Sequence, residues 1–159
     1  VFLLVANINF FPLVLNLINS RPWEIKKIVL PQHTDHAGVM WHGAYLNWME
    51  EGRVEALNNV GLPYHELSLK GYEMPVISLE IKYKFALKHG DLVIIKTSFL
   101  KKKGLCIKCK AIFEKSDGVI AAESLVNLVV VNNKNGLHSL VRNLPENVKK
   151  SILSLEQGT

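Results

Sequence analysis

The stretch DHAGVMWHGAYLNWMEEGRVEALNNVGLP, residues 35–63, decides the fold, because it joins a glycine-containing loop to one long helix. Apolar residues recur there at helical spacing and predict a helix over Leu46–Val60 with one apolar face. The residues of that face are Leu46, Met49, Ala56, Leu57 and Val60. Gly61 and Pro63 end the helix. Gly52 stands in its middle at a cost of about 1 kcal/mol relative to alanine, so we expect a neighbouring strand to approach closely there.

The loop carries Asp35 seven residues before the expected first turn of the helix. A carboxylate can act as a general base or as a nucleophile. The first N–H groups of a helix have no partner within the helix and can stabilise an oxyanion. Together these groups are the minimum equipment for cleaving an activated acyl group. The structural alternative is a loop aspartate that only caps a turn.

Beyond the helix the pattern changes to a period of two. Ile77–Phe85 alternates apolar and polar residues and predicts a half-buried antiparallel strand. Ser116-Asp117-Gly118 predicts a hairpin turn. We also expect strands over Trp23–Leu30, Leu92–Leu100, Leu105–Phe113 and Val119–Val131, a turn over Lys101–Gly104, and helices over Pro63–Lys70 and Pro145–Leu155. One long helix on the concave face of a meander of about four strands is an α+β design.

The length of 159 residues suits one domain, and 48% apolar against 21% charged residues is an ordinary globular balance. Residues 1–20 are interpreted as an apolar extension, interrupted too often by asparagine and proline for a membrane span. Residues 21–159 are interpreted as a single domain with a C-terminal tail. Cys106 and Cys109 are too few for a disulfide framework and suit the reducing cytoplasm, where we expect the protein. Their offset of three on a strand sends Cys109 into the core and Cys106 outward.

The net charge of +5 is concentrated between residues 82 and 115, where ten lysines stand against two acidic residues. An exposed basic region attracts the phosphates of nucleic acid, of a membrane surface or of a phosphorylated cofactor. A solvated sheet face explains the same lysines. The aromatic-rich basic motif of an RNA-binding sheet is absent, so we expect no nucleic-acid partner.

The pattern Asp35-x-x-Gly38-x-x-Trp41-His42-x-x-Tyr45-x-x-Trp48-Met49-Glu50-Glu51-x-Arg53 resembles the hotdog-fold thioesterases of the 4-hydroxybenzoyl-CoA thioesterase and YbgC-like type. The resemblance runs from about Trp23 to Val131. It implies a hotdog fold, in which a curved antiparallel sheet wraps a long central helix. It also implies an acyl-CoA substrate at the interface of a homodimer with a continuous sheet, and such dimers often pair into homotetramers.

By this resemblance Asp35 would be the catalytic carboxylate, as base or nucleophile. The backbone N–H at His42, beside Gly43, would polarise the thioester carbonyl, and the products would be a free acid and CoA. The chain departs from the family pattern at two positions, since Trp41 replaces a frequent tyrosine and Gly52 a more usual alanine. Neither change removes the carboxylate or the backbone donor.

Further candidates for substrate binding lie in and beyond this motif. Trp41 and Tyr45 are candidates for lining an acyl pocket, although aromatic residues beside a helix start more often serve packing. Glu50 is expected to pair with Arg53, three residues on, or else to orient water. Lys101, Lys102 and Lys103 are candidates for binding the phosphates of CoA. The alternative is that they form only the solvated tip of a hairpin.

Three histidines near Asp35, namely His33, His36 and His42, raise the question of a zinc site. The short loop offers no second cluster of ligands, so we expect no metal and no cofactor. Three rival functions stay open: a non-catalytic module that binds acyl groups, CoA or acyl carrier protein; an acyl-carrier-protein thioesterase; and a dehydratase of the same fold. Dehydratases usually need a catalytic histidine paired with a carboxylate in a different helix context. The acyl group cannot be derived from the sequence.

Overall fold

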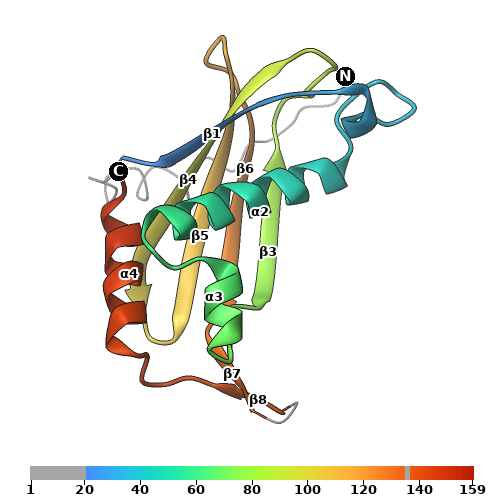
Figure 1. Ribbon diagram of the computed structural model, residues 1–159. Coiled ribbons are helices and arrows are strands. Elements are labelled where there is room, and N and C mark those ends of the chain that lie inside the picture. Colours follow the sequence, from blue (N-terminus) through green and yellow to red (C-terminus); the bar gives the residue numbers. More distant parts are fainter. Residues whose placement is uncertain (1–20, 135–136) are drawn as a thin grey trace.

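A five-stranded antiparallel sheet carries the fold, and a long helix crosses one of its faces (Figure 1). The computed structural model describes residues 21–134 and 137–159, without the side chains of Lys102 and Lys134. The extension predicted for residues 1–20 lies outside the described residues. The sheet has the order β1-β4-β5-β6-β3, with β1 (Trp23–Ile28), β3 (Val76–Tyr83), β4 (Leu92–Lys103), β5 (Cys106–Lys115) and β6 (Ile120–Val129).

The predicted meander holds for β4, β5 and β6 but is wrong for β3. That strand pairs with β6, where Lys82 lies opposite Glu123, and not with β4. The connection from β3 to β4 therefore runs from one side of the sheet to the other, and on its way Leu87 O accepts a hydrogen bond from Met40 N at 2.7 Å. The prediction of a half-buried strand is also wrong, because β3 ends the sheet and only Ile81 is partly covered.

The central helix α2 (His42–Asn59) begins at His42, where the spacing from Asp35 placed the helix start, and four residues before the start that the apolar periodicity predicted. Its buried face is centred on Tyr45, Trp48, Gly52 and Ala56. Leu46, which was expected on that face, is exposed. The prediction for Leu46 failed because aromatic and small residues, together with the buried Arg53, decide which face packs on the sheet.

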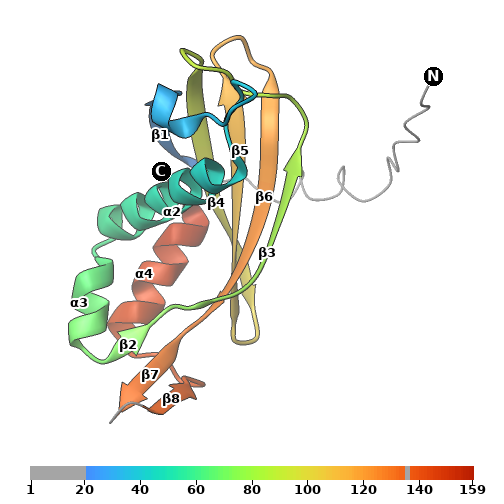
Figure 2. The same ribbon diagram turned by 90° about the vertical axis from the view of Figure 1, so that its right-hand side faces the viewer.

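The C-terminal helix packs into the core, whereas Leu137–Leu140 before it are exposed. Helix α4 (Glu146–Gln157) confirms the predicted helix and lies on the same side of the curved sheet as α2 and α3 (Tyr64–Leu69) (Figure 2). It buries Val148, Ile152 and Leu155. Trp23 Nε1, at the start of β1, donates a hydrogen bond to Leu155 O at 3.5 Å.

The observed strands differ from the predicted ones in two respects. Strand β4 continues through Lys103, so the turn lies at Gly104 (φ +67°) and does not include Lys101. The last predicted strand is divided into two, and a small second sheet was not predicted. That sheet has the order β2-β7-β8 and consists of β2 (Tyr72–Glu73), β7 (Val131–Lys134) and β8 (Leu137–Leu140). Within the described ranges, no helix has the length and apolar character that a membrane span requires.

Candidate active site

The Asp35 loop is a tight hairpin between β1 and α2. Trp41 N donates to His33 O at 3.0 Å, and Asp35 N donates to Val39 O at 2.9 Å, so the two legs are paired. Gly38 forms the tip with a φ of +74°, which favours glycine, and its N–H donates to Asp35 O at 3.0 Å. The hairpin fixes how far Asp35 lies from the start of the helix.

The carboxylate of Asp35 is exposed and only half engaged. Its Oδ1 accepts hydrogen bonds from Ala37 N at 2.8 Å and from Val39 N at 3.4 Å. Its Oδ2 has no hydrogen-bond partner in the part of the chain that the structure describes. The side chain therefore caps a turn, as the structural alternative predicted, and also keeps one oxygen available for chemistry.

The start of α2 is uncapped. Trp41 precedes the helix in an extended conformation (φ −74°, ψ 151°), and no side chain accepts from the first turn. Ala44 N donates to Trp41 O at 3.0 Å, whereas the N–H groups of His42 and Gly43 have no acceptor among the described residues. Unpaired N–H groups at a helix N-terminus bind anionic oxygen, helped by the helix dipole.

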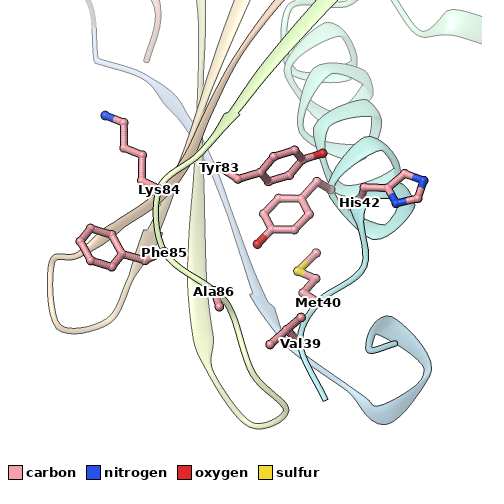
Figure 3. Close-up of a pocket in the computed structure, with 8 residues that line it drawn as sticks. Val39, Met40, His42, Tyr83, Lys84, Phe85 and Ala86 are labelled. Carbon is pink, nitrogen blue, oxygen red and sulfur yellow. The ribbon is translucent and has the colours of Figure 1, made fainter. Parts of the chain in front are cut away.

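A pocket of about 310 Å³ lies beside this helix start (Figure 3). Its walls come from the second leg of the hairpin, the first turn of α2 and the segment that ends β3. They consist of Val39, Met40, His42, Tyr45, Tyr83, Lys84, Phe85 and Ala86. Figure 3 shows the ring of Tyr83 directed toward the helix, while Lys84 and Phe85 point away from it. The lining is mostly apolar, as an acyl group requires.

Tyr45 forms a buried wall of this pocket. Its ring packs edge-to-face on Tyr83, with centroids 5.1 Å apart, and on Phe113 at 5.2 Å. Burial, followed by the neighbouring Tyr83, raises the pKa of Tyr45 to about 12. The phenol therefore stays protonated at neutral pH, so this wall is uncharged.

Trp41, which precedes α2, and Glu50, which lies within it, do not line the pocket. The indole of Trp41 covers Gly43 so closely that a Cβ on Gly43 would overlap the ring, which explains the glycine. Trp41 also packs edge-to-face on His42 at 5.3 Å. The predicted pair is present, with Glu50 Oε1 3.6 Å from Nη2 of the buried Arg53, and the carboxylate of Glu50 faces solvent.

The three lysines proposed for CoA phosphates lie far from Asp35 within one chain. They lie at the last residues of β4, whereas the first residue of β4 pairs with the end of β1 close to the hairpin. The two ends of β4 are roughly 30 Å apart along the strand. Lys101 lines a second pocket beside α4, and the side chain of Lys102 lies outside the described residues. Other lysines of the basic region form ion pairs on the sheet, as Lys96 does with Glu114 at 2.7 Å, and this fits a solvated face.

The histidines near Asp35 do not gather into a metal site. Among the residues in the structure, no group of three or more His, Cys, Asp or Glu side chains is placed to hold a metal ion. His33 instead uses its Nδ1 to accept a hydrogen bond from Leu30 N at 3.1 Å.

Most of the pocket lining was not predicted, namely Val39, Met40, Tyr83, Lys84, Phe85 and Ala86. The sequence signal that could have indicated these residues is the pair of large aromatic residues at the end of the alternating stretch Ile77–Phe85. Both Tyr83 and Phe85 are more than half exposed in the chain, which is unusual for aromatic residues at positions expected to be half-buried.

Comparisons with known proteins agree with this geometry. Residues 29–152 match the family described as "Thioesterase-like superfamily". The protein sll0410 of Synechocystis sp. (strain PCC 6803), a proposed esterase, is 31% identical over 144 residues, covering 90% of this chain and 86% of that protein. The DHNA-CoA thioesterase from Staphylococcus aureus superposes with a TM-score of 0.75 at 20% identity, covering 84% of this chain and 89% of the other.

A second solved structure, BH1999 gentisyl-coenzyme A thioesterase, superposes with a TM-score of 0.70 at 26% identity. The match covers 79% of this chain and 98% of that one. These similarities confirm the predicted α+β hotdog fold. The chain belongs to the thioesterase-like superfamily.

Proposed function

We propose that this protein is an acyl-CoA thioesterase, which hydrolyses a thioester to a free acid and CoA. The observation that carries the proposal is that the Asp35 hairpin and the start of α2 both contribute residues to one apolar pocket, although Asp35 and Gly43 themselves are not among the residues that line it. The hairpin that carries Asp35 continues into Val39 and Met40, which line the apolar pocket. The same pocket is bounded by His42, the first residue of the uncapped helix.

In the proposed reaction the acyl group occupies the pocket and the thioester oxygen accepts hydrogen bonds from His42 N and Gly43 N. These donors and the helix dipole stabilise the negative charge that develops on that oxygen. Asp35 acts through Oδ2 in one of two ways. It attacks the carbonyl carbon, expels the CoA thiolate and forms an anhydride that water hydrolyses, or it takes a proton from an attacking water.

We propose that a second copy of the chain completes the site by pairing along β3. In the described sheet β3 has a neighbour on one side only, so its other backbone edge is open. Exposed apolar side chains run along it, namely Val76, Ile77, Leu79, Tyr83 and Phe85. An apolar open edge invites pairing with another strand. Such a homodimer would cover the pocket at Tyr83 and Phe85, and phosphate contacts by Lys101–Lys103 would then come from the second copy.

The choice between CoA and acyl carrier protein, the pairing of dimers into a homotetramer and the cytoplasmic location stay predictions from the sequence. The solved relatives described above act on CoA thioesters, as their names state, which favours CoA as the carrier.

The proposal is tested by measuring release of free thiol from aromatic, short aliphatic and medium aliphatic acyl-CoAs, and from acyl carrier protein loaded with the same groups. We expect turnover of at least one acyl-CoA, with selectivity among acyl groups and no loss of rate in a strong chelator. Equal failure on every substrate would contradict the proposal and favour a non-catalytic binding module.

A further inference from the structure

His33 makes contacts that the reaction itself does not use. Its ring Nδ1 accepts a hydrogen bond from Leu30 N at 3.1 Å, and its own backbone N–H donates to Leu30 O at 2.9 Å. These reciprocal bonds close the 3₁₀ turn Pro31–His33, which leads directly into the Asp35 hairpin. Because Nδ1 accepts, the ring carries its proton on Nε2.

His33 also contacts the residue that precedes α2 and a residue within α2. Its carbonyl oxygen accepts the N–H of Trp41 at 3.0 Å, which ties the two legs of the hairpin together. Its ring packs edge-to-face on Trp48 of α2, with centroids 5.1 Å apart and planes at 82°. Trp48 is only 2% exposed, so the ring of His33 rests on a fixed part of the core.

We propose that His33 is a positioning residue for Asp35, acting through its Nδ1. The hydrogen bond to Leu30 holds the 3₁₀ turn closed, and the closed turn presents His33 O to Trp41 N. Asp35 follows two residues later, so its place relative to the helix start depends on this turn. A shift of about 1 Å in a reacting group can cost about 100-fold in rate. The inference rests on the proposed function, because it assigns the importance of the turn to the reaction of Asp35.

Two substitutions test the hydrogen-bond acceptor and the ring of His33 separately. His33→Asn keeps an acceptor oxygen near the place of Nδ1 but loses the ring, whereas His33→Phe keeps the ring against Trp48 but loses the acceptor. We expect His33→Phe to lower kcat about 10- to 100-fold with little change in KM. We expect His33→Asn to retain most of the wild-type kcat. Equal kcat in the two variants would overturn the proposal, whether both match the wild type or both fall.

A second readout does not depend on activity. Amide hydrogen exchange at Trp41, whose N–H is bonded to His33 O, should be faster in His33→Phe than in the wild type and near normal in His33→Asn. Lys115 N, which donates to Val119 O at 2.9 Å in a distant hairpin, should exchange equally in all three proteins. Unchanged exchange at Trp41 in His33→Phe would overturn the proposal.

The variant Asp35→Asn distinguishes this inference from the proposed function. If Asp35→Asn stays active while His33→Phe still speeds exchange at Trp41, the role of Asp35 fails and the turn-closing contact of His33 stands. If Asp35→Asn is inactive and His33→Phe is fully active, the positioning role fails and the proposed function stands.

Discussion

Helix α2 packs on β4 at a point where Gly52 faces Thr97. A Cβ on Gly52 would lie 2.6 Å from Thr97 Oγ1, 3.6 Å from Ile95 Cγ2 and 3.8 Å from Ile25 Cδ1. In folded proteins a Cβ atom essentially never lies within 3.0 Å of a non-bonded heavy atom, so the first contact would be a steric clash. Thr97 is fully buried, so its side chain has little space into which to move. The close approach expected from the glycine in mid-helix is therefore confirmed, and it predicts an unusual response to substitution.

Gly52→Ala combines two opposing effects. Replacing glycine by alanine inside a helix ordinarily stabilises by about 1 kcal/mol, whereas forcing an extra carbon into a packed core costs about 1–3 kcal/mol. Because the Cβ would overlap Thr97, we expect packing to win and the free energy of unfolding to fall by about 1 kcal/mol. In a Thr97→Ala background Oγ1 is gone, so the same change should raise the free energy of unfolding by up to about 1 kcal/mol. The sign of the effect should therefore reverse.

The assay is urea unfolding followed by tryptophan fluorescence, at one fixed protein concentration because the stability of a dimer depends on concentration. Thr97→Val is the matched control, since it keeps a methyl group where the hydroxyl stood and should preserve the destabilisation. A double-mutant cycle isolates the coupling between Gly52 and Thr97. If Gly52→Ala changes stability equally in all three backgrounds, the packing argument is refuted.

Two further predictions concern the β3 edge and the pocket wall. Leu79→Lys, on the open edge, should shift the protein toward monomer in light scattering and lower its activity, whereas the equally apolar but remote Leu69→Lys should do neither; identical masses for both would contradict pairing along β3. The unfolded chain releases the Tyr45 proton from about pH 10 and the native chain only near pH 12, so the wild type should lose up to about 3 kcal/mol of stability across that range, and full stability should be present below it. Tyr45→Phe should lack this component, and equal slopes of unfolding free energy against pH would disprove it.

The parts of the fold that depend on local pattern were predictable. The long helix and the turn at Ser116–Gly118 follow from spacing and from turn residues that act within a few positions. The neighbour of β3 was not predictable in this way, because its pairing with β6 depends on a connection that crosses the end of the sheet. The exposed Leu46 shows the same limit, since the buried face of α2 was set by which side chains fit the sheet.

In the candidate site, too, the local parts were predictable from the sequence and the parts that depend on distant residues were not. Asp35 and the helix start lie within one short stretch, so the sequence alone was enough to propose them together as candidates. The pocket joins that stretch to Tyr83 and Phe85, more than 40 residues away in the chain. Only the three-dimensional structure brings them together. The role of His33 was also hidden, because it depends on which ring nitrogen accepts a backbone hydrogen bond.

The central claim is that Asp35 does chemistry and does not merely cap a turn, and a matched pair of substitutions tests it. Asp117 is the control, because its Oδ1 accepts from Val119 N at 3.1 Å two residues on, as Asp35 accepts from Ala37 N at 2.8 Å. The decisive measurement is kcat/KM for CoA release by Asp35→Asn beside Asp117→Asn. We predict a loss of about 100- to 10,000-fold for Asp35→Asn and wild-type turnover for Asp117→Asn. Equal turnover in the two variants would contradict the account.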